Sequence, residues 1–253
     1  MRRVLVLDIV RLGLLLVTFA AAGVYDWFKR EIPIKTWIPA ILLGVIFDIV
    51  EAISGTFNAV YLVPPLIIIA AVSYMCMKGM IGGADVLAAI TVTAILPEPP
   101  RLWWAPSIFP PLITLIAYYG LFTLLLVVLN LLRNVTRITV IKSVPAPLYQ
   151  KLILAIYSRP MSVSKFLRTK FYYPAYIPGN LLRLHFNVEE DDSAWRAKIR
   201  ELVVRGVLRE DSEILVTWGI PTVSLLAVAL VLYIAIGDWI LLKVFEFVLR
   251  TRL

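Results

Sequence analysis

Six apolar runs constrain this chain more than any other feature of its sequence. A helix that crosses the hydrocarbon core of a bilayer needs about 20 predominantly apolar residues. The second and fourth runs are short, so flanking residues would have to extend them or neighbouring helices would have to shield them from lipid. We expect an all-α integral membrane protein with about six transmembrane helices. The runs are about Val4 to Val24, Trp37 to Val50, Ala59 to Met77, Asp85 to Leu96, Ile108 to Leu132 and Ile214 to Ile236.

The composition is typical of a membrane protein and indicates which kinds of partner it contacts. The chain is 60% hydrophobic and only 17% charged, whereas soluble chains are roughly 45–50% apolar. The net charge of +8 is typical of cytoplasmic loops and contact with anionic lipid, so membrane lipid is the expected partner and nucleic acid is not. With one cysteine, Cys76, and one histidine, His185, we expect no disulfide, no metal site and no cofactor.

A basic insertion separates the fifth and sixth runs. It holds 14 Lys or Arg and 8 Asp or Glu over residues 133–213, together with recurring aromatic residues that argue against disorder. We expect residues 1–132 to form a five-helix transmembrane bundle and residues 133–213 a small basic cytoplasmic domain of short helices. Residues 214–253 would form the last transmembrane helix and an amphipathic helix, Trp239 to Leu249.

Basic loops set the expected orientation, because cytoplasmic loops carry an excess of Lys and Arg. The loops after the first, third and fifth runs are basic, and the alternate loops have almost no Lys or Arg. This pattern predicts a multi-pass protein of the cell membrane with both termini outside, although Arg2 and Arg3 oppose it. Asp26, at the end of the first run, and Asp85, at the start of the fourth, would then lie on the cytoplasmic side and could face one another.

The two aspartates have distinctive surroundings. Gly82 and Gly83 precede Asp85 in a small-residue segment that an extended peptide could approach closely; alternatively, the segment is a turn in which Asp85 caps a helix. Arg30 and Pro33 follow Asp26 in what could also be a simple interfacial turn. Four other acids are expected to be caps or interfacial groups, with Asp8 pairing with Arg11 one helical turn away. They are Asp8, Asp48, Glu51 and Asp238.

Two motifs carry a resemblance to a known family. Asp26-Trp-Phe-Lys-Arg30-Glu-Ile-Pro33 resembles the first aspartate motif of type IV prepilin peptidases, and Gly82-Gly83-Ala84-Asp85 resembles their GxGD motif, which presenilin and signal peptide peptidase share. The lack of paired CxxC motifs and the basic insertion resemble the archaeal branch, which includes preflagellin peptidase. The sequence departs from the family at Ala84, where the motif has glycine, and at Leu87, where members often have lysine.

The resemblance implies a membrane aspartyl endopeptidase. Its substrates would be pilin-like or archaellin precursors, whose short basic leader, a class III signal peptide, is cut at the cytoplasmic face. Asp26 and Asp85 would be catalytic, and Gly82, Gly83, Ala84, Arg30 and Pro33 would bind substrate or support the loops. Two adjacent carboxylates can share a proton, so that one activates water while the other polarises the scissile carbonyl. The acids from Glu189 to Asp192 are candidate contacts for the basic leader.

Two other classes of function remain as alternatives. A proton- or cation-coupled transporter could use Asp26 and Asp85 as ion sites, but it predicts carboxylates near the midplane and broken helices, whereas both acids lie at the ends of apolar runs. A non-catalytic subunit of a membrane assembly has no motif in this sequence that would indicate it.

Overall fold

The computed structural model describes residues 2–102, 104–184, 186–187 and 190–250. The chain divides into two compact units. The bundle unit comprises Met1–Phe122 and Pro221–Leu253, and the sheet unit comprises Thr123–Ile220.

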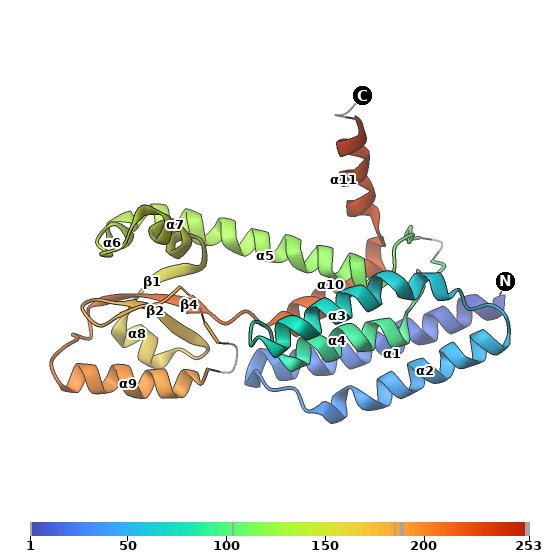
Figure 1. Cartoon of the computed structure of the whole chain (residues 1–253), viewed down its shortest axis with the longest axis horizontal. Coiled ribbons are helices and arrows are strands. Elements are labelled where there is room, and N and C mark those ends of the chain that lie inside the picture. Colours follow the sequence, from blue (N-terminus) through green and yellow to red (C-terminus); the bar gives the residue numbers. More distant parts are fainter. Residues whose placement is uncertain (1, 103, 185, 188–189, 251–253) are drawn as a thin grey trace. The chain divides into compact units, whose positions relative to one another are not determined.

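The bundle unit is helical and is organised around α4 (Gly83–Ile95), which packs against α1, α2, α3 and α10 (Figure 1). Small residues along α4, among them Ala88 and Ala89, are buried and let its neighbours approach. At Gly44 of α2 a side-chain Cβ would lie only 2.4 Å from the backbone oxygen of Ala94. The surrounding helices are α1 (Arg2–Lys29), α2 (Ile38–Ile53), α3 (Val63–Met77), the first part of α5 (Pro111–Val135), α10 (Thr222–Ile236) and α11 (Trp239–Arg250), with short 3-10 helices η1 (Ile34–Thr36) and η2 (Ala59–Leu62).

Membrane-spanning candidates are fewer than the six apolar runs. Four of the described helical segments are long and apolar enough to cross a bilayer, or five if α10 and α11 form one bent span. They are Val6–Lys29, Ile34–Ile53, Ala59–Met77 and Pro111–Val135, and the bend between α10 and α11 is 77°. The bend falls at Gly237, whose φ is +59° and whose Cβ position would lie 2.1 Å from the oxygen of Pro106, so only glycine fits.

The predicted start of the sixth run is wrong. Residues Glu213–Trp218 form strand β4, and the helix α10 begins at Thr222, after Pro221. The strand is a short apolar run rich in β-branched residues and is buried in its centre, so periodicity alone could not separate it from the helix that follows. Residues Trp239–Arg250 form helix α11, where the sequence predicts an amphipathic helix.

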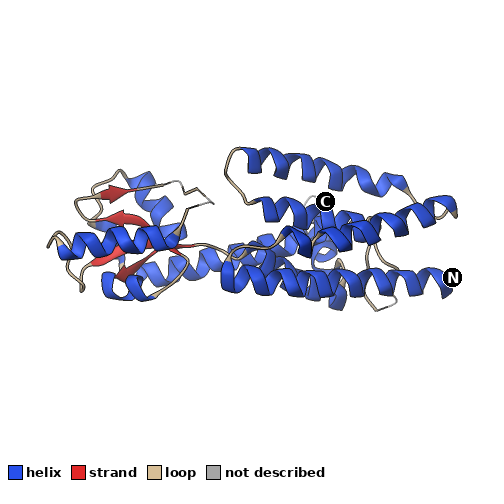
Figure 2. Cartoon of the chain, turned by 90° about the horizontal axis from the view of Figure 1, so that it is seen from below, coloured by secondary structure: helices blue, strands red, loops and turns tan. Residues whose placement is uncertain are grey.

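The sheet unit contains a four-stranded antiparallel sheet in the order β1-β4-β2-β3, so the expectation of an all-α fold is wrong for this unit (Figure 2). Alternate residues of β4 face two cores: Ile214 and Val216 pack with residues of α8 and α9, and Leu215 packs with residues of α6 and α7. The elements are α6 (Ile138–Lys142), α7 (Leu148–Tyr157), β1 (Ser158–Ser162), α8 (Val163–Arg168), β2 (Tyr172–Ile177), β3 (Leu181–Leu182) and α9 (Asp192–Val204), with the last turns of α5.

Candidate active site

Asp26 lies in the last two turns of α1 and is only 8% exposed. Its Oδ2 accepts a hydrogen bond from the backbone N–H of Ser224, at 2.9 Å, and lies 3.2 Å from the Ser224 hydroxyl. That hydroxyl is also 2.8 Å from the carbonyl oxygen of Gly23, and its single proton can serve only one of the two acceptors. Because Ser224 is in the first turn of α10, the free N–H groups and the dipole of that helix favour a negative charge on Asp26.

A glycine on α1 permits this contact. The Cβ position of Gly23 would lie 3.3 Å from the Cβ of Ala227 and 3.4 Å from the Cα of Ser224, so the two backbones meet closely here. A larger residue would push α10 away from α1. Gly23 therefore brings the N-terminus of α10 within reach of the Asp26 carboxylate.

Arg30 ends α1 and turns back over Asp26. Its φ is +60°, the left-handed conformation in which a helix usually ends on glycine. Its N–H donates to the carbonyl oxygen of Asp26 at 3.2 Å, and its Nη1 is 3.8 Å from Asp26 Oδ1. A strained residue beside a buried acid is typical of functional sites. Pro33 then continues the turn in extended conformation and precedes η1.

Asp85 is the third residue of α4, and its Oδ2 accepts a hydrogen bond from the Gly82 N–H at 3.1 Å. Asp85 therefore caps the start of α4, which is the alternative that the sequence left open. The charge of Asp26 acts electrostatically on Asp85, so the fold brings the two acids of the sequence motifs near each other. Two turns carry these acids. Arg30 and Pro33 lie in the turn after Asp26, and Gly82 and Gly83 lie in the turn before Asp85.

The motif glycines and the departures from the motif have simple structural explanations. A Cβ at Gly83 would meet nothing within 4 Å, so space is open above this residue. Ala84 lies within α4 and is not among the residues with positive φ, so glycine is not needed there. Leu87 packs against the bundle core in place of the lysine of the family.

An apolar pocket of about 320 Å³ adjoins Asp85. Asp85 is the charged member of its described lining, and Ala88, Ala89 and Val92 continue the wall along one face of α4. The other walls come from α3, α5 and the start of α10, including Val72, Leu115 and Thr222. A carboxyl group at one end of an apolar pocket is suited to act on a chain whose apolar side chains occupy that pocket.

The acids at the opposite end of α1 and α2 are bonded to an arginine side chain or to a backbone N–H. Arg11, only 2% exposed, donates at 2.7 Å to Asp48, to Glu51 and to the carbonyl oxygen of Ile95. The predicted pairing of Asp8 with Arg11 is wrong: Asp8 accepts from the backbone N–H of Arg101 at 3.0 Å. The buried pair across helices is preferred because an isolated neighbour pair on one helix is worth only about 0.2–0.5 kcal/mol.

Asp238 is the most buried of these acids. It is 0% exposed and accepts from the N–H groups of Ile108 and Phe109 and from the hydroxyl of Thr114, at 2.5, 2.8 and 2.6 Å. These contacts hold the loop before α5 against the bend at Gly237. Asp238 therefore anchors the loop before α5 and is not exposed at the membrane–water interface.

The acidic turn of the sheet unit is also engaged internally. Glu190 pairs with Arg183 and accepts from Trp195, Asp191 caps α9, and Asp192 pairs with Arg196. Burial alone would raise the pKa of Glu190, but hydrogen bonds from Arg183, Asn187 and Trp195 hold that pKa below its usual value. Glu189 and His185 lie outside the described residues. Within the described part of the chain, no group of acids, Cys or His is arranged to hold a metal ion.

Sequence reasoning missed Ser224. This residue is 198 positions from Asp26 and belongs to no aspartate motif. The only local signal is a serine just after Pro221 at the start of an apolar helix, which is too common a pattern to single out.

Comparison with known families agrees with the two motifs. Residues 13–133 match the type IV leader peptidase family, and residues 150–239 match the archaeal peptidase A24 C-terminus of type II. The first match includes both Asp26 and Asp85, and the second covers most of the sheet unit and all of α10. No curated protein matches the chain. The chain therefore belongs to the type IV leader peptidase family, with the C-terminal region of its archaeal members, and is a peptidase of the aspartic type.

Proposed function

We propose that Asp26 and Asp85 form the catalytic dyad of an endopeptidase that removes the short basic leader of pilin-like or archaellin precursors. The observation that carries the proposal is the proximity of two acids from separate turns, Asp26 buried and Asp85 partly buried beside an apolar pocket. Membership of the leader peptidase family supports the same reaction. A precursor is cut just before its apolar helix, so apolar side chains after the scissile bond would enter the pocket while the leader stays outside it.

The surroundings of the two acids suggest different roles in peptide hydrolysis. Asp26 accepts a hydrogen bond from the Ser224 N–H and has the Arg30 guanidinium 3.8 Å away. Asp85 has a single backbone donor and an apolar pocket beside it. In the proposed mechanism Asp26 takes a proton from water, and protonated Asp85 donates a hydrogen bond to the scissile carbonyl. The open space above Gly83 admits the extended peptide.

The proposed topology keeps six transmembrane helices. Besides the four candidate spans and the bent α10–α11 pair, it includes α4. At 13 residues α4 is too short to span alone, but it is largely enclosed by its neighbours. The basic loop after α1 and the basic sheet unit would lie in the cytoplasm, and the proposed dyad would then lie near the cytoplasmic face. The same positive charges would contact anionic lipid rather than the basic leader, which they repel.

The transporter alternative fits the bundle less well. Both aspartates lie at helix ends, Asp26 near the end of α1 and Asp85 at the start of α4. An ion site of an alternating-access transporter is expected near the midplane, between broken helices. The family matches point to peptide hydrolysis instead.

The direct test is to change each aspartate to asparagine. Asp26→Asn and Asp85→Asn keep the size of the side chain but cannot shuttle a proton, so each should abolish cleavage of a co-expressed pilin-like precursor. Both variants should still accumulate in membranes. Asp211→Asn, at an exposed acid of the sheet unit, is the matched control and should cleave normally. Normal cleavage by either dyad variant would refute the proposal.

A further inference from the structure

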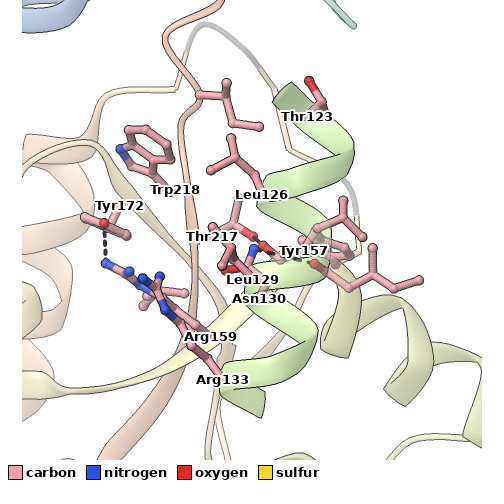
Figure 3. Close-up of a pocket in the computed structure, with 14 residues that line it drawn as sticks. Thr123, Leu126, Leu129, Asn130, Arg133, Tyr157, Arg159, Tyr172, Thr217 and Trp218 are labelled. Atoms are coloured by element: carbon pink, nitrogen blue, oxygen red, sulfur yellow. Dashed lines mark hydrogen bonds between the residues drawn. The ribbon is translucent and has the colours of Figure 1, made fainter. Parts of the chain in front are cut away.

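A second pocket, of about 360 Å³, lies wholly within the sheet unit (Figure 3). One wall is the last three turns of α5, from Thr123 to Arg133, and the opposite walls come from α7, β1, β2 and β4. This volume falls in the range of small-molecule sites, about 300–1,000 Å³. Nothing in the proposed cleavage reaction uses this pocket, because neither aspartate lines it.

The pocket is positively charged. Arg133 and Arg159 both line it, and its described lining contains no carboxylate. In the described part of the chain neither arginine forms an ion pair. Figure 3 shows the two arginines toward one end of the pocket and Thr123 at the other. Two arginines without a counter-charge at one end of a cavity favour an anion, and phosphate oxygens match the guanidinium fork.

One of these arginines is held in place. The Arg159 guanidinium donates to the Tyr172 hydroxyl, and its Cζ lies 4.6 Å from the centre of the Tyr172 ring. A cation–π contact and a hydrogen bond together restrict the side chain, so less conformational entropy is lost when it binds a ligand. Arg133, by contrast, is an exposed residue in the last turn of α5.

Most of the remaining lining residues are apolar or aromatic, as at the edge of a bilayer, with Thr123, Asn130 and Thr217 as the other polar members. Helix α5 is a candidate span of 25 residues, about 37 Å long at 1.5 Å per residue, whereas the hydrocarbon core is about 30 Å thick. Its last turn, with Arg133, would therefore reach the level of the headgroups. Tyr172 and Trp218 supply the aromatic groups that are enriched at this interface.

We propose that this pocket binds an anionic phospholipid, with its phosphate held by Arg133 and Arg159 and part of an acyl chain along Leu126, Leu129 and Ile220. A free phosphate ion would use the arginines but would leave the apolar wall exposed to water. A zwitterionic lipid would place its own positive group beside the two arginines. The bound lipid would fix the end of α5 to the sheet at the membrane surface.

The test measures retention of phosphatidylglycerol by the full chain in detergent, by native mass spectrometry. The wild-type protein should retain phosphatidylglycerol at least about tenfold better than phosphatidylcholine. Arg133→Gln with Arg159→Gln should weaken the affinity by about tenfold for each lost charge-assisted contact. Arg133→Gln alone, at an exposed position that cannot disturb the core, should give about half of that effect on a logarithmic scale.

The matched control removes two exposed arginines of the same unit that do not line the pocket, Arg168→Gln with Arg200→Gln. This control should retain the lipid as the wild type does. Equal loss in the control, or undiminished retention by the pocket variants, would overturn the proposal. Competition by millimolar inorganic phosphate as effective as that by the lipid would also overturn it, because the acyl chain would then contribute nothing. None of these readouts depends on peptide cleavage.

Discussion

The acidic side chains at the two ends of the bundle differ in their partners. At the end that holds the start of α1, Asp48 and Glu51 each pair with Arg11 at 2.7 Å. Asp238 accepts two hydrogen bonds from the loop before α5 and one from Thr114 in the first turn of α5. At the other end, Asp26 accepts a hydrogen bond from the Ser224 N–H, but the Arg30 guanidinium is 3.8 Å away from it. Asp85 has a single backbone donor.

This difference separates structural acids from candidate catalytic acids. A buried ion pair with good geometry and satisfied hydrogen bonds holds helices together and has no capacity left for chemistry. A pair of acids whose charges oppose each other is unfavourable for folding, and such sites are found where proton transfer requires them. A cation at hydrogen-bond distance from both acids, rather than depth in an apolar helix, therefore distinguishes Asp48 and Glu51 from Asp26 and Asp85.

The largest predicted effect on stability is at Arg11. Arg11→Met keeps the length of the side chain but leaves the half-buried Asp48 and Glu51 without a cation. This should destabilise the bundle by up to about 3–5 kcal/mol, the cost of removing one partner of a buried ion pair. The measurement is unfolding in mixed detergent micelles. Arg205→Met, which breaks an exposed pair with Glu201, should change stability by less than about 1 kcal/mol. Equal stability of the two variants would show that Arg11 is not a structural cation of the bundle.

Arg30 should show the opposite balance between stability and activity. Arg30→Gly removes the charge beside Asp26 but also relieves a left-handed conformation that costs a non-glycine residue about 1–2 kcal/mol. Stability should therefore stay within about 1 kcal/mol of the wild type, while cleavage falls about tenfold, as for the loss of one charge-assisted interaction. Arg30→Lys keeps the charge and should retain most of the activity. A large loss of stability in Arg30→Gly would assign this residue to the structural group.

Ser224 should have a smaller effect. Ser224→Ala removes the hydroxyl 3.2 Å from Asp26 but keeps the stronger backbone donor at 2.9 Å, so cleavage should fall only about three- to fivefold. Ser54→Ala is a suitable control, because the Ser54 hydroxyl also bonds to a helix carbonyl but lies at the end of α2. If both variants cleave at the wild-type rate, the hydroxyl contributes nothing to the site.

The smallest predicted effect extends the comparison to the sheet unit. Because the pKa of Glu190 is lowered in the folded state, its ionised form contributes stability above its ordinary pKa of 4.5, and this is lost as pH falls through the lowered value. The thermal midpoint of the wild type should drop more than that of Glu190→Gln between pH 6 and pH 3. The thermal midpoint of Glu201→Gln, a change at an exposed residue, should depend on pH as that of the wild type does. Parallel curves for wild type and Glu190→Gln would show that Glu190 is not paired in solution.

Sequence patterns predicted the helices well where the apolar runs were long. The third run, for example, coincides with η2 and α3 together, from Ala59 to Met77. The strand β4 was missed because it is buried on both faces and so lacks the alternation that identifies a half-exposed strand. Charge patterns could place Asp26 and Asp85 at the same level, but they could not identify the Arg11 partners or Ser224. Those contacts depend on which helix faces pack together.

The most direct measurement of the central claim is a double-mutant cycle on cleavage. Residual cleavage of a pilin-like precursor would be measured in long incubations of folded Asp26→Asn, Asp85→Asn and the double variant. General acid–base catalysis contributes about 10²–10⁴-fold, and groups that act as one unit are not additive. We predict that all three variants have the same low residual rate. A double variant slower than either single variant by the product of their separate losses would contradict a shared dyad.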